Sequence, residues 1–228
     1  MEHQKPERLQ KILQLVANRQ PDLTVFMEDV HKPHNLAAIV RTADAVGIGE
    51  VHATFPEDVQ YRGHHTASGS KRWVKTHAYD SLEQGLQVAR DKNMQILCAH
   101  FSDEAVDFRS IDYTKPTCLL VGSELVGVSD KAAQAADQHV IIPMLGMVQS
   151  LNVSVATALI LYEAQRQRAE AGMYGECKIP QEEVDYLIFK SLHPSVKKYC
   201  DKHKIRYPKL NDIGDIEDPD WDLLRKLV

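Results

Sequence analysis

The chain has 228 residues, 43% of them hydrophobic, and its 27 Lys and Arg against 32 Asp and Glu give a formal net charge of −5. These values exclude a disordered chain and fit one domain with extensions, or two small domains. The mild acidity on its own argues against a nucleic-acid partner. Four cysteines without C-x-x-C spacing disfavour a structural zinc site, and we expect no metal. We find no signal peptide and no run of about 18 apolar residues, so we expect a cytoplasmic protein without a membrane span.

The first half of the chain alternates helical and strand patterns. Apolar residues at helical spacing predict an amphipathic helix over residues 6–18, before Pro21. A helix is also predicted from Asn35 to Gly47, and another over residues 82–91. Strands are predicted at residues 23–27, 51–55, 74–77 and 95–99.

The second half continues this alternation and then changes. Strands at residues 117–121 and 140–144 precede a long helix over residues 151–168, residues 181–203 look helical, and residues 221–227 form a last helical turn or two. Continuous apolar strands alternating with helices predict an α/β fold, a mainly parallel sheet with helices on both faces. We expect a helical extension at residues 1–22, the α/β domain at residues 23–170, and a second helical extension at residues 171–228.

Three corners where a strand meets a helix carry the candidate chemistry, because ligands bind beyond the carboxyl ends of parallel strands. The first, residues 31–35, enters the helix that carries Arg41. Asn35 is explained equally well as a helix N-cap, and a lone helical Arg41 usually faces solvent. His31 and His34 lack a third metal ligand at typical spacing.

The second and third corners are marked by glycines and by an apolar loop. Residues 122–127 place Glu124 between two glycines, although an ordinary loop carboxylate is the alternative. Residues 143–152 form a loop unusually rich in Met, Leu and Val, which suits a ligand with an apolar heterocycle. In the purely structural interpretation, Ser150 caps the long helix and Asn152 lies in its first turn.

Together, residues 31–47, 122–127 and 142–163 resemble the three motifs of the SpoU branch of the SPOUT RNA methyltransferases. The resemblance covers residues 23–170 and is greatest to the members that methylate guanosine-18 in the tRNA D-loop. It implies a C-terminal deep trefoil knot, a homodimer, and a pocket for S-adenosylmethionine formed by the knot loops. The cofactor contacts it implies are Ala99, Gly122, Ile142, Met144 and Leu151.

The resemblance also implies the reaction, transfer of a methyl group from S-adenosylmethionine to a ribose 2′-hydroxyl. It assigns the activating role to Arg41, with Asn35, Glu124, Ser150 and Asn152 around it. Because a guanidinium is a very poor base, two interpretations are open. Either Arg41 loses its proton through desolvation or a second positive charge, or it stays charged, holds an RNA phosphate and stabilises the developing alkoxide. We favour the second.

Charge is distributed unevenly along the chain, so the net charge of −5 does not exclude a nucleic-acid partner. Residues 190–209 hold seven basic residues and one acid, residues 60–77 hold four basic residues and no acid, and residues 211–228 hold six acids and two bases. Basic clusters beside a methyltransferase domain indicate phosphate contacts, although each alone could be a solvated face. The tRNA contacts we expect are Arg8, Lys11, Arg19, Lys71, Arg72, Arg166, Arg168, Lys197, Lys198 and Lys202.

Two alternatives remain at this point. One is a SpoU-type enzyme for another RNA, either ribosomal RNA or the tRNA anticodon loop. The other is a noncatalytic RNA-binding protein that retains the knot. The presence of all five residues of the implied catalytic set argues against the second alternative.

Overall fold

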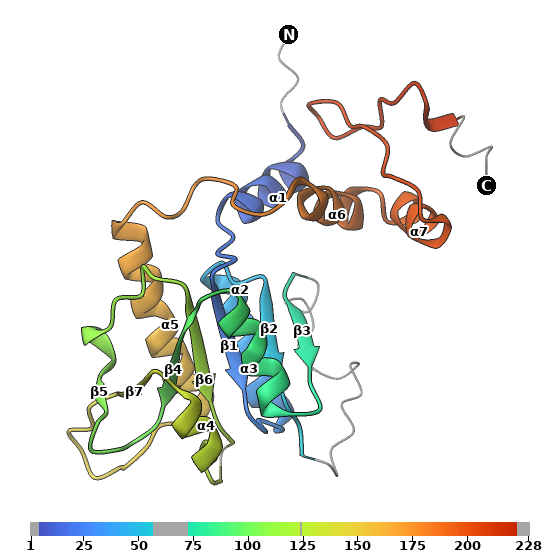
Figure 1. Ribbon diagram of the computed structural model, residues 1–228. Coiled ribbons are helices and arrows are strands. Elements are labelled where there is room, and N and C mark those ends of the chain that lie inside the picture. The colour runs from blue at the N-terminus through green and yellow to red at the C-terminus, as the bar shows by residue number, and fades with distance from the viewer. Residues whose placement is uncertain (1–4, 57–72, 124, 223–228) are drawn as a thin grey trace. The chain divides into compact units, whose positions relative to one another are not determined.

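The computed structural model describes residues 5–56, 73–123 and 125–222, and the chain forms two compact units (Figure 1). The larger unit is Gln20–Tyr174, and the smaller unit joins Met1–Arg19 to Gly175–Val228. The two ends of the chain share a unit because α1 (Glu7–Ala17) packs against α6 (Gln181–Leu192). The sequence predicted a helical extension at each end of the chain, and the helices of both ends lie in this one unit.

The larger unit is built on a seven-stranded sheet, counted over the described residues, in the order β3-β2-β1-β6-β4-β7-β5. Every strand pair is parallel, which confirms the predicted parallel sheet. The strands are β1 (Leu23–Met27), β2 (Glu50–Ala53), β3 (Lys75–Ala78), β4 (Gln95–Ala99), β5 (Val106–Asp107), β6 (Thr117–Val121) and β7 (Gln138–Ile141).

Helices cover both faces of this sheet. Val25 of β1 and Leu119 of β6 share a core with the helices α2 (Pro33–Ala45) and α5 (Val153–Glu170). Their neighbours Phe26 and Leu120 face the opposite core, with α3 (Leu82–Asp91) and α4 (Asp130–Ala135). Successive side chains of a strand point to opposite faces, so strands buried on both sides read as continuous apolar runs.

The short elements differ from the sequence predictions. The two-residue strand β5, the 3-10 helix η2 (Phe108–Ser110) and α4 were not predicted, because segments this short carry too little periodicity. Strand β7 ends at Ile141 rather than at Met144. Pro143 has no backbone N–H to donate to the sheet, which is consistent with an early end. Residues 142–152 are therefore all loop.

The cysteines behave as expected for buried thiols. Cys98 and Cys118 are free and buried in the core shared with α3 and α4. Burial raises the pKa of both thiols to about 12, and the negative charge of Glu28 adds to the effect at Cys98.

The smaller unit contains α1, α6 and α7 (Pro194–His203). The apolar side of α1 is buried, which confirms the predicted amphipathic helix. The predicted helical segment 181–203 is divided at His193, because Pro194 begins a new helix. Of the predicted last turn, Trp221 and Asp222 are helical and the rest lies outside the described residues. No helix among the described residues is both long and apolar enough to cross a membrane.

Candidate functional site

All three predicted corners lie at one edge of the sheet. Strands β1, β6, β4 and β7 are consecutive neighbours, and each is parallel to the next. Their carboxyl ends lead into residues 28–32, 122–129, 100–105 and 142–152 respectively. This is the edge at which parallel α/β sheets bind ligands.

Asn35 is buried in the first turn of α2 rather than capping it. The N-cap of α2 is Lys32, with Pro33 as the first helical residue, so the N-cap interpretation of Asn35 is wrong. Asn35 is only 2% exposed, and its side-chain Oδ1 accepts a hydrogen bond from Asn152 Nδ2 at 3.2 Å. The first corner is therefore joined directly to the third.

Asn152, not Ser150, is the N-cap of α5. Asn152 Oδ1 accepts hydrogen bonds from the backbone N–H of Ser154 at 2.9 Å and from its Oγ at 2.6 Å. Asn152 uses its Nδ2 for the bond to Asn35. One amide thus fixes the start of α5 and holds it against α2, whereas Ser150 is exposed.

The loop after β6 is a tight hairpin. Ser123 and Gly127 exchange two backbone hydrogen bonds of 2.9 Å. A Cβ atom on Gly122 would lie 2.1 Å from the carbonyl carbon of Gly127, and Gly127 itself has φ +73°. Both glycines are therefore required by the backbone. Glu124 lies between them, outside the described residues.

The Gly122→Ala variant should lose about 2 kcal/mol of stability, because the added methyl overlaps the backbone of Gly127. Urea unfolding of purified protein measures the change. Gly146→Ala is the matched control, since a Cβ there meets nothing within 4 Å. Equal unfolding midpoints for the two variants would contradict the close approach at Gly122.

Apolar side chains at the same edge face solvent. Leu145 and Met147 are fully exposed at 102% and 99%, and Val126 of the hairpin is 84% exposed. Exposed apolar groups gathered at one place mark a binding surface. Of the predicted cofactor contacts, Gly122 is buried, and Ala99, Ile142, Met144 and Leu151 are half-buried; all five lie at the carboxyl ends of β4, β6 and β7 or in the loops that directly follow them.

Arg41 lies further along α2 than Asn35, and its side chain is exposed. The helix therefore leaves the guanidinium accessible to a ligand from solution. A base role through desolvation requires a buried guanidinium, so the exposure of Arg41 favours the charged role over the role of a base.

Comparison with known proteins now adds to this geometry. Residues 22–162 match the model of the SpoU rRNA Methylase family, and residues 166–219 match that of the SpoU rRNA methylase C-terminal region. The chain belongs to the SpoU methylase family. This SpoU methylase is 50% identical over 219 residues to the tRNA (guanosine(18)-2'-O)-methyltransferase of Escherichia coli strain K12, with 95% of this chain and 96% of the relative covered.

Solved structures support the same family. A crystal structure of the A. aeolicus TrmH/SpoU tRNA modifying enzyme matches with a TM-score of 0.74 and 43% identity, over 83% of this chain and 97% of that one. An AdoMet-bound rRNA methyltransferase from Sinorhizobium meliloti matches with a TM-score of 0.57 and 30% identity, over 65% of this chain and 60% of that one. The fold expected from the resemblance is thus confirmed for the sheet and its helices.

Two arginines that the sequence assigned to tRNA are buried in this SpoU methylase. Arg168 is 0% exposed, and its guanidinium donates to Asp22 Oδ1 at 2.6 Å and to the backbone oxygens of Tyr113 and Lys115 at 2.9 and 3.0 Å. Arg19 is 2% exposed. The predicted phosphate contacts of Arg168 and Arg19 are therefore corrected: the sequence could not show which face of each segment packs inward.

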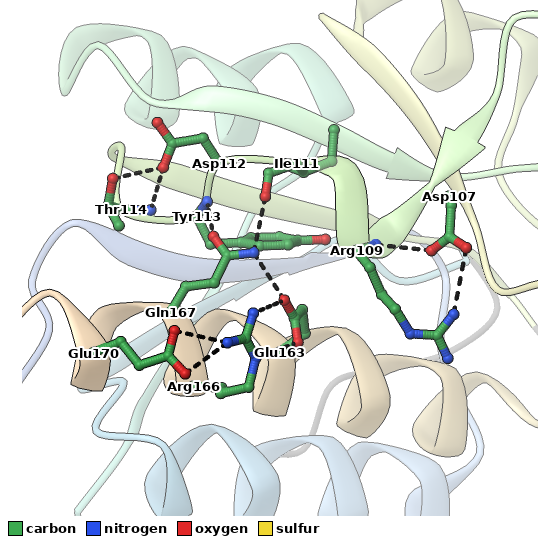
Figure 2. A network of polar contacts seen from close by, with 10 residues as sticks. All are labelled: Asp107, Arg109, Ile111, Asp112, Tyr113, Thr114, Glu163, Arg166, Gln167 and Glu170. Carbon is green, nitrogen blue, oxygen red and sulfur yellow. Dashed lines mark hydrogen bonds and ion pairs between the residues drawn. The ribbon is translucent and has the colours of Figure 1, made fainter.

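Three other predicted contacts, the exposed Arg166 and Lys11 and the half-buried Lys197, are already paired within the protein. Figure 2 shows the guanidinium of Arg166 between Glu163 and Glu170, with nitrogen–oxygen distances of 2.7 Å to each. These two carboxylates raise the pKa of Arg166, and Arg166 lowers the pKa of Glu163. Lys11 pairs with Glu7 at 2.6 Å, and Lys197 pairs with Asp201 at 2.5 Å. Each of these basic groups presents less net charge to a ligand than the sequence suggested.

The remaining predicted tRNA contacts fall into three groups. Arg8 is exposed and donates from Nε to Ser191 Oγ at 3.0 Å. Lys198 and Lys202 are exposed on α7. Lys71 and Arg72 lie outside the described residues.

The sequence reasoning also missed a residue at this edge. Glu28 directly follows β1 and is 8% exposed. A carboxylate immediately after a mostly apolar strand was the available signal. Its contacts are described below.

Proposed function

We propose that this SpoU methylase transfers the methyl group of S-adenosylmethionine to the 2′-hydroxyl of guanosine-18 in the D-loop of tRNA, in the cytoplasm. The observation that carries the proposal is the extent of the 50% identity, which spans 95% of the chain. The identity therefore includes the helices of the smaller unit as well as the parallel sheet. A shared sheet alone would support only the chemistry, whereas shared outer helices support the substrate.

The loops at the sheet edge fit S-adenosylmethionine, which supplies an electrophilic methyl group on its sulfonium. The Gly122 hairpin leaves no room for a side chain at its base, so a ligand there meets backbone groups. The loop of residues 142–152 offers exposed apolar side chains and backbone donors to a flat heterocycle. We assign the cofactor contacts to Ala99, Gly122, Ile142, Met144 and Leu151.

The polar residues have two kinds of role: some contact the RNA, and others hold the surrounding loops in place. Arg41 holds an RNA phosphate and stabilises the negative charge that develops on the 2′-oxygen. This oxygen takes the methyl group as the bond to sulfur breaks, and the hydroxyl proton passes to water. Asn35 and Asn152 hold the start of α5 through their 3.2 Å hydrogen bond. Glu124 and Ser150 are assigned to orient the 2′-hydroxyl. In-line displacement needs accurate positioning, and these side chains provide it.

Nucleoside mapping tests the function. Purified protein is incubated with labelled S-adenosylmethionine and an unmodified tRNA transcript, and the product is digested and analysed by mass spectrometry. We expect 2′-O-methylguanosine at position 18. Methylation of the anticodon loop, or of ribosomal RNA only, would show that the substrate is another RNA, while the proposed 2′-O-methyl transfer would stand. Absence of methylation on every RNA would leave the noncatalytic alternative.

We also propose that the protein is a homodimer formed through α5. Val155, Leu159 and Tyr162 follow one another at helical spacing and are between 43% and 54% exposed. They form one apolar stripe on a helix whose opposite side is buried in the core. A second copy of the same stripe would remove both from water.

Leu159→Asp should convert the dimer into a monomer, because it places a charge in the middle of this stripe. Light scattering coupled to gel filtration measures the mass in solution. Gln84→Asp adds the same charge to the exposed surface of α3 and serves as the control. A dimer of unchanged mass in Leu159→Asp would exclude α5 as the interface.

We propose that α7 contacts tRNA phosphates through Lys198 and Lys202. The double variant Lys198→Ala/Lys202→Ala should weaken tRNA binding and reduce the slope of log affinity against log salt by about 1 to 2, because each contact releases about one counterion. Filter binding at several salt concentrations measures both values. Lys115→Ala, an exposed lysine of the larger unit, is the control. An unchanged slope in the double variant would remove α7 from the interface.

A further inference from the structure

Glu28 is a buried carboxylate that the roles assigned so far do not use. It is the first residue after β1, and its backbone N–H donates to the backbone oxygen of Val121, the last residue of β6, at 2.8 Å. Its side chain lies beside the point where the chain leaves β6 for the Gly122 hairpin. Burying a carboxylate is costly unless its oxygens are bonded. Its partners therefore identify its role.

Both oxygens of Glu28 bind one residue. Oε2 accepts from the backbone N–H of Ser129 at 2.7 Å, and Oε1 accepts from Ser129 Oγ at 2.6 Å. The same Oγ accepts from the backbone N–H of Ala132 at 3.1 Å, which makes Ser129 the N-cap of α4. Two charge-assisted hydrogen bonds thus fix Ser129 in position and in rotamer.

Ser129 ends the segment that Gly122 begins. The start of the segment is held by the pairing of Val121 in the sheet, and the exchange of hydrogen bonds between Ser123 and Gly127 closes the hairpin. After Gly127 the chain has left the sheet, and its far end is held by Val128, which is buried in the core shared with α3 and α4, and by the polar contacts of Ser129. Burial of Val128 is non-directional, whereas the two hydrogen bonds from Glu28 fix the position and orientation of Ser129 at this end of the segment.

We propose that Glu28 is a positioning residue for S-adenosylmethionine, which holds the Gly122 hairpin in the conformation that receives the cofactor. The inference rests on the proposed function, since it assumes that this hairpin belongs to the cofactor site. Glu28 acts through Ser129 and touches neither the cofactor nor the RNA. Its loss changes the affinity for the cofactor and leaves the tRNA contacts of the smaller unit intact.

The test compares two ligands in the full-length protein. S-adenosylhomocysteine binding, measured by calorimetry without RNA, should weaken about tenfold to a hundredfold in Glu28→Ala, because both bonds to Ser129 are lost. The KM for S-adenosylmethionine should rise in parallel, and the KM for tRNA should stay within about twofold. Glu28→Gln should recover part of the affinity, since its amide oxygen still accepts from the Ser129 N–H.

Ser129→Ala keeps the proposal testable if Glu28→Ala fails to fold. It removes the Oγ bond and keeps the backbone bond, so its effect should be smaller and in the same direction. The Glu28→Ala/Ser129→Ala double variant should bind S-adenosylhomocysteine more weakly than the wild type. The fold-loss in affinity should be smaller than the product of the fold-losses of the two single variants, because both changes break the same interaction. Glu83→Gln is the matched control, since this exposed carboxylate pairs with Lys131, also on α4, at 2.6 Å.

Two outcomes would overturn the proposal. One is a Glu28→Ala protein with a lower melting temperature and unchanged affinity for S-adenosylhomocysteine, which would make the role purely structural. The other is an equal loss of cofactor and tRNA binding. Failure of the proposed function is seen separately, in the wild-type protein, which would then bind S-adenosylhomocysteine but not methylate tRNA.

Discussion

Arg41→Ala should lower kcat by about 10²- to 10³-fold, the range found when a single donor to a developing oxyanion is removed. The side chain is exposed on α2, so its removal creates no cavity and leaves the fold unchanged. Single-turnover methylation of tRNA measures the effect on the chemical step. Thermal unfolding and S-adenosylhomocysteine binding should match those of the wild type.

The Arg41→Lys variant separates the two roles considered for this residue. Lysine keeps the positive charge but loses the forked guanidinium, so a charged role predicts an intermediate rate. The rate should then show no new dependence on pH below the titration of lysine. A base role predicts instead that the lysine variant becomes faster as pH rises. Near-full activity in Arg41→Lys would remove the need for a guanidinium in either role.

Arg168→Ala should destabilise the protein by about 3 kcal/mol, although the sequence places this residue in a basic helix end. The change leaves the carboxylate of Asp22 without its 2.6 Å partner. It also removes hydrogen bonds to the backbone oxygens of Tyr113 and Lys115, and to the side chain of Gln20. Urea unfolding monitored by circular dichroism measures the loss.

Arg166→Ala is the control for this prediction, because it removes a guanidinium two residues earlier on the same helix. Arg166 is exposed and pairs only with carboxylates of its own helix among the contacts described, so the expected cost is below about 1 kcal/mol. If the two variants unfolded at the same urea concentration, the interior role of Arg168 would be wrong.

The sequence predicted the sheet well because its strands are long enough to show continuous apolar runs. Residues 23–27, 95–99 and 117–121 were predicted with the bounds that β1, β4 and β6 have in the structure. The three corners were also placed at the ends of strands. Their convergence at one edge follows from the parallel order, which alternation of strands and helices already implies.

The details of the corners could not be predicted in the same way. The structural interpretation of the sequence made Asn35 and Ser150 the N-caps and placed Asn152 in a first turn, since small polar side chains are common at helix starts. Only the packing of α2 against α5 determines that Asn152 is the N-cap of α5 and that its Nδ2 donates a hydrogen bond to Asn35 Oδ1. Arg168 and Glu28 were missed for a related reason. A charged residue next to apolar ones is buried or exposed according to partners that are distant in sequence.

The polar ties at the sheet edge join distant parts of the chain: Glu28 and Ser129 are 101 residues apart, and Asn35 and Asn152 are 117 apart. Synthesis proceeds at about 5 to 20 residues per second, so the partners of β1 and α2 leave the ribosome roughly 5 to 20 seconds after β1 and α2 themselves. During that interval the β1 edge that later pairs with β6 is an unprotected strand. We therefore expect slow folding of the nascent chain, with this edge of the sheet among the last parts to form. Aggregation should be greatest before β6 pairs with β1.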